Sequence, residues 1–233
     1  MVEKILAKDR YFNDFGWLKT YWLFSFSDYY DPKNVNHGTL RVFNDDVVQP
    51  GKGFGLHPHE EMEIVSIILE GEMTHRDTMG NDTVIRVGDV QRMTAGTGLQ
   101  HSEWNNGAEA VAFFQIWIQP GQRGLDPSYD QRSFKPEHWQ GKLALLASPG
   151  GRNGSVNLNA DAQLYRGRYE SDADFKYQAE AGRALFLYVI EGSIEVNGVE
   201  AKTRDQLRFE SESELAISVN QSADIILIDV PLR

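Results

Sequence analysis

The chain has 233 residues and a formal net charge of -11. Such an acidic surface repels nucleic acid and anionic membranes, and no run of Lys or Arg offsets it, so we expect no direct nucleic-acid partner and no membrane partner. Cysteine is absent, which excludes disulfides, iron–sulfur clusters and thiolate metal sites. Any metal must therefore bind to nitrogen and oxygen ligands.

The two segments that could direct the chain to a membrane are both unsuitable for that role. The N-terminal sequence MVEKILAKDRYFNDFGW is too polar for the core of a signal peptide. The longest apolar stretch, residues 184–190, is too short to cross a bilayer. We expect a soluble, cytoplasmic protein.

Short apolar or alternating runs recur along the chain and are separated by turn signals. They are rich in Val, Ile, Phe and Tyr, and they occupy residues 38–48, 63–77, 83–93, 110–120, 184–198 and 223–231. This pattern predicts an all-β sandwich or barrel. The pair Asn197-Gly198 predicts a two-residue hairpin turn, because both residues tolerate positive φ. Short helices are expected only near residues 136–140 and 159–163.

A weak internal repeat indicates two related domains. Residues 67–73 and 188–194 both read as three apolar residues, then Glu-Gly, one further residue and another apolar residue. A polar stretch with Gly and Pro, residues 120–159, separates the halves and contains the natural boundary. We therefore predict two small β-barrel domains, residues 1–135 and residues 136–233.

Two pairs of polar residues in the first half have the spacing of metal ligands. All six histidines lie at or before His138, so the second half offers no imidazole. In an extended strand, residues i and i+2 share a face, so His57 and His59 can point into one barrel, as can His101 and Glu103. Three nitrogens and a carboxylate suit a first-row divalent metal. The alternative is that each pair is simply polar and lies on a strand edge.

The residues around the pairs resemble the double motif of the cupins. Gly51 stands six residues before His57, Glu63 follows the pair, and glycines at 71, 88 and 96 precede His101. The second motif departs from the common form in two ways: Thr94 stands in place of the usual proline, and two extra residues precede His101. The resemblance implies a bicupin of two jelly-roll barrels, the second without metal ligands.

The match narrows to one family. The segments GWLKTYWLFSFSDYYDP, LRVFNDDVV, GFGLHPHEEMEIVSIILEGEMTHRDTMGN, AGTGLQHSEWN and FFQIWIQP resemble the pirins across residues 10–135, and the rest resembles their degenerate second cupin more loosely. In pirins the metal is held by the two histidines of the H-x-H pair and by a later His-x-Glu pair. The resemblance therefore implies His57, His59, His101 and Glu103 as ligands of one divalent metal. Iron is the expected ion, with copper, manganese, nickel or cobalt as alternatives.

Three glutamates, Glu61, Glu63 and Glu103, have the parity required of the acidic ligand. The glutamate of the common cupin motif falls by register at Ile64, and a slip of one residue turns a side chain to the opposite face, so either Glu63 needs a β-bulge or it is not the ligand. We therefore favour Glu103 and expect Glu63 to orient an imidazole as a hydrogen-bond acceptor.

Other polar and aromatic residues receive structural interpretations. His75 is expected to be a hydrogen-bonded structural histidine, and His37 and His138 are expected to be solvated in loops. Aromatic residues between 17 and 30 could line a pocket for a flat ligand, but the more common role of such residues is core and inter-domain packing.

The family resemblance also implies an activity. Some pirins, bacterial ones included, act as quercetin 2,3-dioxygenases. By that resemblance the flavonol 3-hydroxyl would lose its proton to Glu103 and bind the metal, after which dioxygen adds and carbon monoxide leaves. The alternative is an iron-dependent, redox-sensing interaction protein with a protein partner, since the human pirin resembles an iron-dependent nuclear cofactor. A metal-dependent isomerase or another dioxygenase on the same scaffold is a third possibility.

Overall fold

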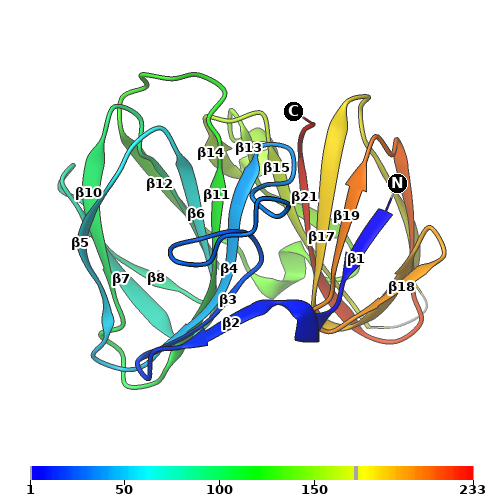
Figure 1. Ribbon diagram of the computed structural model, residues 1–233, viewed down its shortest axis with the longest axis horizontal. Helices are drawn as coiled ribbons and strands as arrows, with labels where there is room; N and C mark the ends of the chain where they lie inside the picture. Colours follow the sequence, from blue (N-terminus) through cyan, green and yellow to red (C-terminus); the bar gives the residue numbers. More distant parts are fainter. Residues whose placement is uncertain (1, 171–172, 233) are drawn as a thin grey trace.

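A computed structural model describes residues 2–170 and 173–232 of the chain (Figure 1). Within these residues the chain forms strands β1 to β21 and three short 3₁₀ turns, and no α-helix. Figure 1 shows two β lobes side by side, with the first half of the chain in one and most of the second half in the other. The predicted all-β architecture is confirmed.

The first lobe consists of two sheets that pack face to face. Its strands are β2 (Tyr11–Asp14), β3 (Leu18–Trp22), β4 (Leu40–Val48), β5 (Gly53–His59), β6 (Glu63–Glu70), β7 (Glu72–Asp77), β8 (Asp82–Arg86), β9 (Asp89–Thr94), β10 (Leu99–Trp104), β11 (Val111–Ile118) and β12 (Ser128–Ser133). One sheet has the order β5-β10-β7-β8 and the other β12-β9-β6-β11-β4-β3-β2. Apolar residues of both sheets, among them Met73 and Phe113, share one core cluster.

The second lobe is formed by one ten-stranded sheet. Its strands are β13 (Leu143–Pro149), β14 (Val156–Leu158), β15 (Gln163–Tyr169), β16 (Ala173–Gln178), β17 (Arg183–Val196), β18 (Val199–Lys202), β19 (Gln206–Glu210), β20 (Glu214–Val219) and β21 (Ala223–Pro231). The N-terminal strand β1 (Val2–Ile5) joins this lobe by antiparallel pairing with β19. In Figure 1 the start of the chain therefore lies against the second lobe.

The central strands of the first lobe are buried on both faces. Phe113 of β11 faces the core of the first lobe, whereas its neighbour Phe114 packs in a cluster with residues of β17 and β21. The ring of Phe114 lies 5.5 Å from that of Tyr188, and Phe43 lies 5.2 Å from Phe186. Burial on both sides explains why β11 reads as an almost continuous apolar run instead of an alternating one.

The two copies of the sequence repeat adopt the same local backbone. Gly71 and Gly192 both have positive φ, at 71° and 88°, where another strand passes closely. A Cβ atom at Gly71 would lie 2.7 Å from the carbonyl oxygen of Ala110, so a side chain is excluded there. The Asn197-Gly198 turn between β17 and β18 is confirmed, with both residues at positive φ.

The expected short helices are only partly present. Residues Pro136–His138 form a 3₁₀ turn (η2), like Ala7–Asp9 (η1) and Arg152–Gly154 (η3). Residues 159–161 form a bend instead of a helix, and Gln163 begins β15. The Asn159 N–H donates to the Glu63 carboxylate and its side-chain amide to Thr94. None of the described segments is a helix both long and apolar enough to pass through a membrane.

Candidate metal centre

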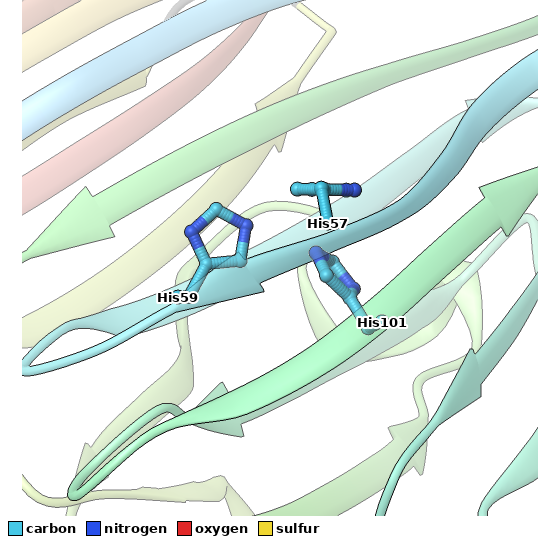
Figure 2. A group of neighbouring side chains, drawn as sticks. All are labelled: His57, His59 and His101. Atoms are coloured by element: carbon cyan, nitrogen blue, oxygen red, sulfur yellow. The ribbon is translucent and has the colours of Figure 1, made fainter.

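Three imidazole side chains of two neighbouring strands in the first lobe lie close together. Strands β5 and β10 pair antiparallel, with His101 opposite His57 and Leu99 opposite His59. Figure 2 shows the three rings on the same side of these strands, two from β5 and one from β10. Their centroids are 4.4 to 4.9 Å apart, and one nitrogen from each ring lies within 4.8 Å of the others. The period-2 geometry of a strand thus brings these three residues together.

Glu103 lies beside the imidazoles and is held by hydrogen bonds. The register of β10 shifts between His101 and Glu103, which places Glu103 opposite Phe54. Its Oε2 accepts a hydrogen bond from Gln115 Nε2 at 2.8 Å, and Ser66 Oγ lies 3.5 Å from Oε1. A carboxylate oxygen of Glu103 groups with nitrogens of His101 and His75 within 4.8 Å. The carboxylate is therefore fixed at the edge of the imidazole cluster by residues of β11 and β6.

Glycine makes the close approach of β5 and β10 possible. An added Cβ at Gly53 would collide with the carbonyl oxygen of Glu103 and lie 2.6 Å from the Cα of Trp104. Gly55, two residues further on, has nothing within 4 Å of that position. The first glycine thus allows strand contact, and the second leaves open space beside His57.

His75 of β7 approaches the cluster from the side opposite β5. The side chain is fully buried, and its Nδ1 lies 3.4 Å from His101 Nδ1. Its Nε2 lies 2.9 Å from Asp77 Oδ2. Burial tends to raise the pKa of Asp77, but hydrogen bonds from His75 and Asn81 outweigh it and the net pKa is lowered. The structural role predicted for His75 is therefore accompanied by direct contact with a candidate ligand.

The electrostatics of the cluster favour neutral imidazoles. Burial, followed by the charges of neighbouring histidines, lowers the pKa of His59 to about 4 and that of His101 to about 3. Nε2 of His101 is buried and has no hydrogen-bond partner among the described residues. Neutral imidazoles with a free nitrogen, beside a carboxylate, are the donors that a first-row divalent metal requires. The residues present therefore fit such an ion.

Glu63 does not have the role expected for it. Its Oε2 accepts the backbone N–H of Asn159 at 3.0 Å and lies 3.9 Å from Arg92 Nε, so its contacts are not with an imidazole. The adjacent Ile64 packs with Met93 in an inward-facing cluster. Because successive residues of a strand point to opposite faces, Glu63 is directed toward the second lobe.

His37 is buried, contrary to the prediction that it is solvated. The side chain is 5% exposed, and its Nε2 lies 3.2 Å from the carbonyl oxygens of Leu185 and Phe209 in the second lobe. Its segment looks like a loop in the sequence, but the neighbouring lobe covers it. His138 is exposed, as predicted.

A cavity of about 580 Å³ adjoins the imidazole cluster. Its walls are mainly aromatic, and its polar lining includes metal-ligand candidates as well as three residues that the sequence analysis missed. The aromatic lining residues are Phe15, Trp17, Trp22, Phe26, Phe54 and Trp117, and the polar ones include His57, His59, Glu103, Asn44, Asp46 and Gln115. Trp117 stacks edge-on against His59, with ring centroids 4.9 Å apart.

The three polar cavity residues that were missed can be recognised in the sequence. Asn44, Asp46 and Gln115 interrupt otherwise apolar strands, VFNDDVV and FFQIWI. A buried polar residue in such a run costs free energy unless it has a partner or a function. Of the N-terminal aromatic run, Trp17, Trp22 and Phe26 line the cavity, whereas Phe24 lies in the core between the lobes.

Fold and site together define a two-domain cupin in which both groups of candidate ligands among the described residues lie in the first lobe. The model of the Pirin family matches residues 6–118, and that of the quercetinase C-terminal cupin domain matches residues 145–230. The chain belongs to the pirin family.

Individual relatives match almost the whole chain. The quercetin 2,3-dioxygenase of Escherichia coli (strain K12) is 40% identical over 226 residues, which are 97% of this chain and 96% of that protein. A pirin-like protein of Caulobacter vibrioides is 37% identical and covers 93% of this chain and 94% of its own length. The crystal structure of the Escherichia coli bacterial pirin YhhW in complex with nickel(II) has a TM-score of 0.95 at 38% identity, with 100% of both chains covered.

Proposed function

We propose that this protein is a metal-dependent dioxygenase that opens the heterocycle of a flavonol such as quercetin. The observation that carries the proposal is the position of the imidazole–carboxylate cluster, which lies at the wall of an aromatic cavity of about 580 Å³. That volume lies in the range of small-molecule sites. The names of the relatives, quercetin 2,3-dioxygenase and a pirin with nickel(II), support the same activity.

His57, His59, His101 and Glu103 would hold one divalent metal, and we propose iron as the resident ion. The same donors accept copper, manganese, nickel or cobalt. When bound, the metal supplies Lewis acidity that lowers the pKa of the flavonol 3-hydroxyl. The neutral state of His59 and His101, produced by burial, keeps their nitrogens available as ligands at neutral pH.

We propose Glu103 as the group that accepts the 3-hydroxyl proton. It lines the cavity, and the hydrogen bond from Gln115 Nε2 at 2.8 Å holds Oε2 in position. The other oxygen, Oε1, has only the 3.5 Å contact with Ser66 Oγ. We propose that Oε1 takes the proton and returns it to the ring-opened product.

The aromatic walls position a planar ligand and exclude water from it. Trp22, Phe26 and Trp117 line the cavity. The ring of Phe26 packs edge-on against both tryptophans, with its centroid 5.5 Å from that of Trp22 and 5.3 Å from that of Trp117. Stacking on such rings favours a flat aromatic substrate. Dioxygen is the oxidant: both of its atoms enter the product, and one ring carbon leaves as carbon monoxide.

Aerobic assay of the metal-loaded protein tests the proposal. The loss of flavonol absorbance, the uptake of dioxygen and the release of carbon monoxide should occur in equal amounts and scale with bound metal. Protein loaded with iron, copper, manganese, nickel or cobalt that never consumes quercetin would exclude the flavonol activity. The iron-dependent interaction protein would then be the remaining alternative.

A further inference from the structure

Two polar side chains of β4 line the aromatic cavity, each with one oxygen that is unpaired among the described residues. Asn44 is 2% exposed and Asp46 is 3% exposed, and both line the cavity. The Oδ1 atoms of both residues are buried and form no hydrogen bond with any described residue. Buried polar atoms are almost always paired, so two unpaired oxygens facing one cavity indicate a ligand.

The strand register explains why these residues face the cavity. Asn44 lies between Trp22 of β3 and Gln115 of β11. Residues 44 and 46 share a face because they are two apart on one strand. Asp45, between them, points to the second lobe, where it accepts hydrogen bonds from Tyr188 and Arg10. The two adjacent aspartates therefore have separate roles.

Gln115 connects this part of the cavity with the candidate metal ligands. Its amide Nε2 donates a hydrogen bond to Glu103 Oε2. Asn44 is one strand further away, and Asp46 lies two residues along from Asn44, roughly 7 Å at the rise of a β-strand. The unpaired oxygens thus lie in the same cavity as Glu103.

We propose that Asn44 and Asp46 form a polar subsite that accepts hydrogen bonds from phenolic hydroxyls of the substrate other than the 3-hydroxyl. The inference rests on the proposed flavonol activity and adds a specificity: a hydroxylated flavonol is selected over one that carries only the 3-hydroxyl.

The charge of the cavity agrees with a neutral, hydroxyl-bearing ligand. No Lys or Arg is among the described residues that line it, so a carboxylate ligand would have no cationic partner. Burial raises the pKa of Asp46 to about 8; interaction with the Thr20 hydroxyl opposes this shift, and the nearby carboxylates of Asp45 and Glu103 add to it. At neutral pH the carboxyl can therefore share a hydrogen bond with a phenol without burying a charge.

Binding measurements under argon test the subsite without turnover. The dissociation constants of quercetin and 3-hydroxyflavone, which lacks every hydroxyl except that at position 3, are measured on the metal-loaded protein by quenching of tryptophan fluorescence. The wild type should bind quercetin at least about 10-fold more tightly, the effect of one or two hydrogen bonds. Asn44→Leu and Asp46→Leu should each reduce this preference several-fold by weakening quercetin binding alone.

Gln91→Leu is the matched control. Gln91 is a buried amide on the inner face of the same sheet, its Nε2 also has no partner among the described residues, and it does not line the cavity. Its replacement should leave the preference unchanged. If Asp46→Leu does not fold, Asn44→Leu carries the same prediction.

The outcomes separate the subsite from the proposed activity. Equal binding of both flavonols by the wild type, or a preference that survives both substitutions, overturns the subsite even if quercetin is consumed in air. A preference that both substitutions remove, in a protein that never consumes quercetin, supports the subsite and refutes the activity. If neither flavonol binds, both the subsite and the proposed activity are refuted.

Discussion

His75 Nδ1 lies 3.4 Å from His101 Nδ1, while His75 Nε2 lies 2.9 Å from Asp77 Oδ2. If His101 binds the metal through its unpartnered Nε2, its Nδ1–H donates to His75, and His75 donates its Nε2–H to Asp77. This chain of hydrogen bonds fixes the tautomer and ring orientation of His101 and makes it a stronger ligand.

Replacement of His75 should therefore weaken metal binding although His75 is not among the proposed ligands. His75→Phe keeps the ring volume and removes both nitrogens, and it should lower metal affinity about 10- to 100-fold. Competition with a chelator measures the change, and His138→Phe in an exposed loop is the control. An affinity equal to that of the wild type would show that His75 only fills space.

Replacement of a proposed ligand should reduce metal binding more strongly than replacement of His75. His57→Ala, His59→Ala and His101→Ala should each remove most of the metal, because in the proposed site these three imidazoles would supply the nitrogen donors. Elemental analysis of purified protein should give close to one metal per wild-type chain, and His138→Ala should match it. Two tightly bound metals per chain would contradict a single site.

Glu103→Gln separates proton transfer from ligation. The amide keeps the volume and an oxygen that can coordinate weakly, but it cannot accept a proton at neutral pH. Flavonol turnover per bound metal should fall about 10²- to 10⁴-fold, the range for loss of a general base. Glu63→Gln is the matched control, because that carboxylate contacts Asn159 instead of the site. A larger loss in the control than in Glu103→Gln would reassign the acidic ligand.

The buried His37 should make stability depend on pH. Burial, followed by the charge of Arg208, lowers its pKa in the folded protein. The unfolded chain takes up a proton near the ordinary value of about 6.5, whereas the folded protein does so only at lower pH. Between these values the unfolded state binds more protons, so stability falls as the pH is lowered through this range. At pH values above this range, His37 adds no pH dependence to the stability of the protein.

The His37→Gln variant isolates that contribution. Gln can still donate to a backbone carbonyl but does not titrate. Urea unfolding at pH 7.5 and pH 5.5 should show the wild type losing stability faster than the variant, by at most about 1.4 kcal/mol per pH unit for one proton. Parallel curves would show that His37 has the same pKa in the folded and the unfolded state.

The sequence alone determined the β architecture and the relation among the main site residues. Strands have a period of two, so H-x-H and H-x-E spacings place side chains on one face without reference to the rest of the fold. The same period, counted from the cupin motif, turned Glu63 away from the site, as observed. These inferences hold because they depend on local geometry.

Only the tertiary structure decided which of the remaining polar residues belong to the site. His75 contacts His101 because β7 pairs with β10, and Asn44 and Asp46 enter the cavity because β4 lies between β3 and β11. His37 is buried because the second lobe covers its segment. Strand pairing and lobe packing join residues far apart in the chain, and no local period encodes which of them will meet.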